Sequence, residues 1–363
     1  MSQTLSTTYE RSGRSHFMGA LRCPVILASL TIFTLFLSIL SLGIGAMSIP
    51  PSQVFYVLYE GLLGQSDLQG NSLVILQIRL PRILMALLCG AALSVSGALM
   101  QGLFRNPLAD PGIIGVSAGA SLAAAFIIVI GDTLLASFIG PLPFFALPVA
   151  AFIGALLAVL LLSAVSIKHG QLSVVTMLLA GIAFSALAGA CLGLLSYISD
   201  DRQLRDITFW TMGSISGASW IKVAAVAPFI LPILIMVPLL ARGLNALSLG
   251  EAEAFHLGIP VQRIKVFTIL CVAIAVGAAV AACGLIGFVG IVVPHILRIA
   301  FGADHRLLLP ASAIAGAALL VCADSIARTI VAPAELPIGI LTALIGAPFF
   351  MWLLLGKQRS MLQ

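Results

Sequence analysis

The chain has 363 residues, of which 61% are apolar and only 9% are charged, and its mean hydropathy is +1.17. Soluble domains are nearer half apolar and a quarter charged, so this composition excludes a soluble fold. The net charge of +5 would suit a nucleic-acid partner, but the placement of the basic residues along the chain gives a different explanation.

An α-helix needs roughly 20 apolar residues to cross the hydrocarbon core of a bilayer. By this rule the sequence predicts an all-α, polytopic membrane protein with about ten transmembrane helices. They are expected near residues 25–47, 82–103, 113–130, 145–167, 174–197, 220–240, 262–283, 285–301, 308–329 and 337–356. The eighth is the shortest. No soluble domain interrupts the series, so residues 25–363 are predicted to form a single transmembrane domain.

Residues 1–24 are polar and basic and are predicted to form a cytoplasmic N-terminal segment. The apolar run after them is too long for a signal-peptide core, so we expect a retained first helix. With the N-terminus in the cytoplasm, twelve of the 18 Lys and Arg residues fall inside and six outside. Cytoplasmic loops of membrane proteins carry such an excess. We therefore expect both termini in the cytoplasm and the basic charge to face lipid headgroups rather than nucleic acid.

Two of the predicted spans carry small residues at helical spacing. These residues are Gly181, Ser185, Gly189 and Gly193 in the fifth span, and Gly339, Ala343 and Ala347 in the tenth. Small residues let helix backbones approach closely, so the faces indicate either ordinary bundle packing or the wall of a substrate pathway. A weak internal similarity between 112–115 and 284–287, both Gly-x-Ile-Gly, suggests two halves related as an inverted repeat.

The sequence contains no motif for a catalytic or metal-binding site. It has no phosphate-binding loop, and its six cysteines are scattered through apolar runs without metal-ligand spacing. We therefore predict no catalytic residue and no metal ligand in this chain. Asp324 is the main ionisable residue expected at membrane depth, and a pair with Arg328, one helical turn later, is its simplest role.

Several motifs in order resemble the permease subunits of ABC importers for ferric siderophores, haem and cobalamin, from about residue 25 to the C-terminus. They include Arg-Leu-Pro-Arg at 79–82, Asn-Pro-Leu-Ala-Asp-Pro at 106–111, Val-Pro-His at 293–295 and Glu-Leu-Pro-Ile-Gly at 335–339. The resemblance implies a ten-helix subunit of a bacterial inner membrane that pairs as a homodimer. It also implies two cytoplasmic ATPase subunits, which hold ATP and Mg, and a periplasmic substrate-binding protein. This chain itself would bind no cofactor and would not be an enzyme.

The resemblance also assigns candidate sites. Helices five and ten line the pathway in this family, so their small-residue faces are candidates for the pathway or for dimer packing. The segment between spans six and seven is expected to form short cytoplasmic helices that dock on the ATPase, the alternative being an ordinary interfacial loop. Its candidate coupling residues are Ser248, Leu249, Gly250, Glu251, Glu253 and His256.

Three basic residues placed outside, Arg79, Arg82 and Arg328, match positions that dock the binding protein in relatives. Arginine suits this role because its planar fork can hold a carboxylate with two hydrogen bonds. The alternative is that they extend to the headgroups at helix ends, with Arg328 satisfied by Asp324.

The overall resemblance is greatest to the haemin branch, so haem is the expected substrate, followed by ferric siderophore and then cobalamin. The fifth span agrees, because residues 174–195 include no charged side chain and only two hydroxyls. A polar chelate shell would meet few partners there. An intramembrane enzyme or a membrane assembly scaffold is the alternative from another class. The first would need convergent polar groups at membrane depth, and the second would not need the long cytoplasmic segment 244–258.

Overall fold

The computed structural model describes residues 3–45, 47–63, 69–134, 143–168 and 170–361. In these ranges the extended structure is one small antiparallel hairpin of two-residue strands, β1 (Ile167–Lys168) and β2 (Gln171–Leu172). The remaining regular structure is helical, which confirms the predicted all-α class.

The helices follow one another with short connections. In chain order they are α1 (Gln3–Gly43), α2 (Pro51–Leu62), α3 (Asn71–Leu73), η1 (Val74–Arg79), α4 (Leu80–Leu103), η2 (Pro111–Ile114), α5 (Val116–Leu134), α7 (Pro143–Ser166), α8 (Val174–Ile198), α9 (Asp201–Met212), α10 (Trp220–Met236), η3 (Val237–Leu240), α11 (Ala241–Leu249), α12 (Glu251–His256), α13 (Val261–Cys283), α14 (Val289–Phe301), α15 (His305–Ala327) and α16 (Ile338–Met361). Seven helical segments of the described chain are long and apolar enough to cross a membrane, and α5, α14 and α16 hold shorter apolar stretches. These segments correspond one to one with the ten predicted spans.

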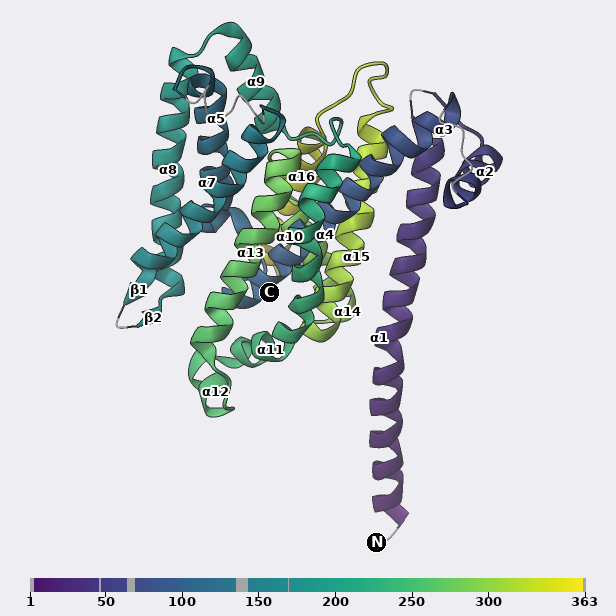
Figure 1. Ribbon diagram of the computed structural model, residues 1–363. Helices are drawn as coiled ribbons and strands as arrows, with labels where there is room; N and C mark the ends of the chain where they lie inside the picture. Colours follow the sequence, from purple (N-terminus) through teal and green to yellow (C-terminus); the bar gives the residue numbers. More distant parts are fainter. Residues whose placement is uncertain (1–2, 46, 64–68, 135–142, 169, 362–363) are drawn as a thin grey trace.

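The bundle has two distinct ends (Figure 1). The start of α1, the β1–β2 hairpin and the pair α11–α12 lie at one end, and α2 and α9 lie at the other. In the predicted orientation the first end faces the cytoplasm. The described part of 1–24 is helical and continuous with the first span in α1. Its cytoplasmic location stays a prediction.

Several boundaries differ from the predicted ones for local reasons. The second span begins at Asn71, because three-residue α3 and the π-helical η1 continue directly into α4. The sixth extends to Leu249 through the 3₁₀ turn η3, which contains Pro238. Proline has no N–H to donate, so the α-helical bonding pattern is interrupted there. The eighth begins only at Val289, because Phe288 has a left-handed φ of 67° and cannot continue a helix backwards.

Two short amphipathic helices, α2 and α9, and the hairpin were not predicted. Helix α9 begins with a capping box in which Asp200 accepts from the Gln203 N–H and Gln203 accepts from the Asp200 N–H. This Asp-x-x-Gln pattern is a known helix-start signal. Both helices are too short for a search that looks only for membrane spans, and α9 is also too polar.

The core lies around α4, which is the most buried of the long spans, with α13 and α15 next to it. By contrast, α1 and α8 are largely exposed. Glycines allow the close helix contacts: Gly90 of α4 lies against Gly316 of α15, and Gly97 of α4 lies against Gly290 of α14. A Cβ at Gly97 would overlap the carbonyl oxygen of Gly290, so only glycine fits this crossing.

The weak repeat noted in the sequence precedes two similar helix starts. Residue Gly115, with φ of 77°, comes directly before α5, and Phe288 comes directly before α14. Both helices are among the three shorter apolar ones. The left-handed residue is the last glycine of the first motif, but in the second it comes one position after the last glycine. The inverted repeat itself stays a prediction.

Candidate functional site

A network of buried charges lies at the end of the bundle that bears α2 and α9. Arg82 of α4 is bonded to both oxygens of Asp324 on α15, at 2.8–3.0 Å, and to Glu335 at 2.7 Å. Arg328 lies 3.9 Å from the same Asp324. The expected Asp324–Arg328 pair is therefore present, but Arg82 is the closer partner. Buried charges need such partners because leaving water is costly.

The other two arginines cap the end of α1. Arg79 donates to the carbonyl oxygens of Leu42 and Met47, and Arg328 donates to the carbonyl and hydroxyl oxygens of Ser41. The last carbonyls of a helix have no partner within it and carry partial negative charge. The two guanidinium groups therefore hold the C-terminus of α1 against η1 and the end of α15.

These contacts bear on the docking hypothesis without testing it. The three arginine side chains predicted to bind a carrier are all buried, and their donors are directed to groups within the chain. Half-exposed Glu335 is the member of the network that solvent reaches. The ion pair between residues 82 and 335 could not be predicted from the motifs. The two residues are 253 positions apart, and neither motif indicates that the other is its partner.

The predicted coupling segment does form two short helices, α11 and α12. They meet at Gly250, whose φ of 140° favours glycine. Leu249 at the end of α11 is 67% exposed and Phe255 of α12 is 71% exposed, so both helices present an apolar group outward. Ser248, Glu253 and His256 are also exposed. Exposed apolar groups beside charged ones are typical of a surface that binds a partner.

Glu251 differs from its neighbours in the coupling segment. Its carboxylate lies 2.6 Å from the ammonium of Lys265 on α13, and Lys265 is only 3% exposed. The same ammonium donates to the carbonyl oxygen of Leu172 at the end of β2, at 3.2 Å. Gln262, one turn before Lys265, accepts from the Leu172 N–H at 3.0 Å. No motif in the sequence singled out Lys265, so its buried position beside Glu251 was not predicted.

A second polar contact joins α11 to the start of α15. The amide of Asn245 donates to Asp304 at 2.6 Å and accepts from the N–H of His305 at 3.0 Å. Burial raises the pKa of Asp304, but hydrogen bonds from the Arg306 N–H and from Asn245 outweigh it, and the net pKa lies below its ordinary value. The start of α15 is thereby tied to α11.

The two small-residue faces divide between packing and exposure. Gly181 packs against the carbonyl oxygen of Ile113, and Gly339 packs against that of Met212, so both serve contacts within the chain. Gly189 and Gly193 have open space beside them. Ser185 and Ala343 are half-buried and Ala347 is exposed. The outer half of α8 is the part left free for a pathway or a second copy.

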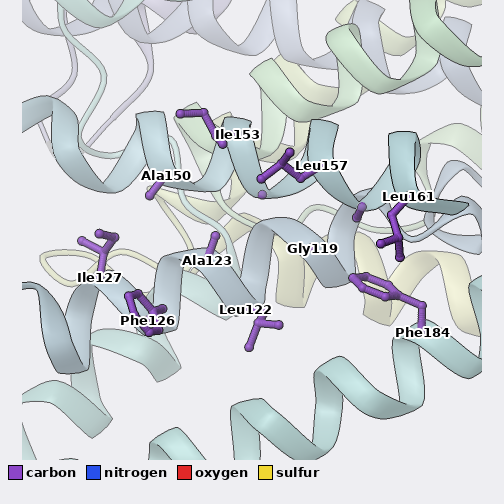
Figure 2. Close-up of a pocket in the computed structure, with 12 residues that line it drawn as sticks. Gly119, Leu122, Ala123, Phe126, Ile127, Ala150, Ile153, Leu157, Leu161 and Phe184 are labelled. Carbon is purple, nitrogen blue, oxygen red and sulfur yellow. The ribbon is translucent and has the colours of Figure 1, made fainter. Parts of the chain in front are cut away.

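An apolar groove of about 520 Å³ lies between α5 and α7, with Phe184 of α8 at one end (Figure 2). Gly119 and Gly154 bring the two helices together at its base. The lining residues are Gly119, Leu122, Ala123, Phe126, Ile127, Ala150, Ile153, Gly154, Leu157, Ala158, Leu161 and Phe184. With no polar side chain, this groove can hold an apolar group but supports no chemistry. Among the described residues, no cluster of three or more His, Cys, Asp or Glu side chains is placed to hold a metal ion.

Comparisons with known proteins extend over the whole bundle. The model of the FecCD transport family matches residues 32–356. The hemin transport system permease protein HmuU of Yersinia pestis is 45% identical over 343 residues, covering 94% of this chain and 98% of that protein. The vitamin B12 import system permease protein BtuC of Vibrio vulnificus is 46% identical over 285 residues, or 78% of this chain and 83% of that protein. A solved structure described as an inward-facing metal-chelate type ABC transporter has a TM-score of 0.79 at 35% identity, covering 92% of this chain and 99% of that chain.

Proposed function

The chain belongs to the FecCD transport family and is a multi-pass membrane permease of an ABC importer, and we propose that it carries haem into the cell. The single observation that supports haem is the 45% identity to the hemin permease of Yersinia pestis, which extends over almost the whole length of both chains. The vitamin B12 permease of Vibrio vulnificus is as similar per residue but over a shorter part of this chain. Cobalamin is therefore the second candidate.

The exposed face of α8 is compatible with a flat, apolar cargo. Its exposed side chains include Val175, Leu179, Ile182 and Leu194. A porphyrin face loses little when it leaves water for such a surface, whereas a hydroxamate or catecholate shell would lose hydrogen bonds. This argument requires α8 to line the pathway, which is part of the proposal.

The same proposal includes the partners of the permease. A second copy would cover the exposed apolar faces of α8 and α16, which neither helix buries within its own chain. Two ATPase subunits would bind at α12, and they would hold ATP and Mg. A periplasmic binding protein would dock at the opposite end, beside the arginine network. Both termini would then lie in the cytoplasm.

The test is growth of an iron-starved strain with and without this gene. With haem as the only iron source, the deletion strain is expected to stop growing and the complemented strain to recover. Growth on a ferric siderophore, and cobalamin-dependent growth in iron-replete medium, are measured in parallel as matched controls. Equal growth of both strains on haem, with lost growth on one of the other two substrates, would transfer the assignment to that substrate.

A further inference from the structure

The ammonium of Lys265, which lies on one helix, bonds to groups on two other elements. Glu251 is the first residue of α12, Lys265 lies on α13, and Leu172 is the last residue of β2, directly before the start of α8. We propose that Lys265 is a positioning residue that transmits movement of α12 to the start of α8 during the transport cycle. This inference rests on the proposed function as an ABC importer.

The start of α8 is held to α13 by both backbone groups of one residue. The carbonyl of Leu172 accepts from Lys265, and its N–H donates to Gln262. Gln262 and Lys265 are three residues apart, so they lie on the same face of α13. The next residue, Ser173, caps α8 through Thr176 and bonds back to Ser166 at the end of α7. A displacement of Lys265 therefore reaches the ends of both α7 and α8.

The other side of the contact, at Glu251, lies next to a break between two helices. Gly250, directly before Glu251, has a φ that favours glycine and joins α11 and α12 without a continuous helix. The side chain of Glu251 is 44% exposed, whereas that of Lys265 is buried. A pair with one partner in solvent adds little to stability and can open and close. The exposed apolar groups of α12 supply the surface on which a partner can act.

Stability alone does not explain a buried lysine at this position. Burying an ammonium group costs free energy, and an apolar side chain of similar length would pack there without that cost. The ammonium has three donors, and two of them are directed to groups on different elements, Glu251 and Leu172. The charged group instead holds Glu251 of α12 and the residues just before α8 in fixed positions relative to each other.

The experiment uses the complete importer, reconstituted in proteoliposomes with its ATPase and binding protein. The measured quantity is substrate taken up per ATP hydrolysed, with haem, cobalamin and a ferric siderophore each supplied. Lys265→Met and Glu251→Gln are each expected to lower this ratio about tenfold, a typical size for coupling between two sites. The double variant is expected to be no worse than either single variant, because both remove one interaction. Lys265→Arg, which keeps the charge and its donors, is expected to recover part of the ratio.

The matched control is Arg263→Gln, which removes an exposed positive charge from the same helix and is expected to leave the ratio unchanged. A wild-type ratio in Lys265→Met, or a drop in Arg263→Gln as large as that in Lys265→Met, would overturn the inference. If Lys265→Met does not assemble, Glu251→Gln decides, because its side chain is half-exposed; a wild-type ratio there overturns the inference.

The two proposals fail in different ways. A wild-type complex that takes up cobalamin but not haem refutes only the haem assignment, and the ratio is then measured with cobalamin. A complex that takes up none of the three substrates refutes the proposed function and this inference with it.

Discussion

Replacing Asp324 by Ala is expected to destabilise the protein far more than replacing Glu335 by Ala. The Asp324 side chain is 2% exposed and is bonded to Arg82 at 2.8–3.0 Å, with Arg328 at 3.9 Å. Without it, the buried guanidinium of Arg82 keeps Glu335 as its carboxylate partner within the described chain. Glu335 is 40% exposed, so much of its interaction with Arg82 is screened by water.

The size of the effect follows from burial. Removing one partner of a buried ion pair costs about 3–5 kcal/mol, because the remaining charge has lost its compensation. A pair with a solvent-exposed partner contributes about 0–1 kcal/mol. Asp324→Asn is expected to lie between the two alanine variants, since the amide keeps the shape and one acceptor oxygen. Replacing both Arg82 and Asp324 by apolar residues of similar size leaves neither charge of the pair unpaired. This double variant is expected to recover most of the stability that Asp324→Ala loses.

The measurement is the free energy of unfolding of each purified variant in mixed micelles, titrated with a denaturing detergent and followed by circular dichroism. The expected order of stability is Glu335→Ala, then Asp324→Asn, then Asp324→Ala. If Asp324→Ala and Glu335→Ala lose the same free energy, or if the double replacement is as unstable as Asp324→Ala, burial does not govern this network.

Three further expectations use other parts of the structure. Gly97→Val should prevent accumulation of folded protein, because a Cβ there overlaps a facing carbonyl oxygen, whereas Gly189→Ala, with open space beside it, should give wild-type yield by size-exclusion chromatography. If Arg82 attracts an acidic carrier, Glu335→Gln should raise the association rate measured across a salt series, since it removes a competing carboxylate; an unchanged rate and salt dependence would count against docking there. The pKa of Asp304 is lowered in the fold, so its stabilisation is complete above its unfolded pKa of about 3.9 and is lost as pH falls through the lower folded value. Asp304→Asn should lack that part of the acid destabilisation when unfolding midpoints are compared between about pH 5 and pH 3.

The class of protein and the places of its apolar helices followed from the sequence alone. Apolar runs of membrane length have only one common solution in lipid, the helix, because each backbone group must find its partner within the segment. The ten predicted spans therefore match ten apolar helices of the described chain. The two short helices α11 and α12 were also predictable, since the residue before Glu251 is a glycine that ends one helix and the charges after it suit the start of another.

Short amphipathic elements were less accessible to the same reasoning. Helices α2 and α9 lie outside the spans, and only the capping pattern at Asp200 and Gln203 gives a local signal for α9. The late start of α14 depends on the left-handed backbone at Phe288. Gly346 of α16 makes room for the Phe288 ring, so this conformation depends on a helix that comes much later in the chain.

Which polar groups meet depends on how the helices pack, and this could be seen only in the folded chain. The sequence placed Arg82 and Glu251 among the candidate site residues, the first for docking a carrier and the second for docking the ATPase, and contained Glu335 only as part of a motif. In the fold, Arg82 bonds to Asp324 and Glu335, and Glu251 bonds to Lys265. Motifs report what a segment can do, whereas a buried charge takes the partner that helix packing brings within hydrogen-bond distance, whatever their separation in the chain.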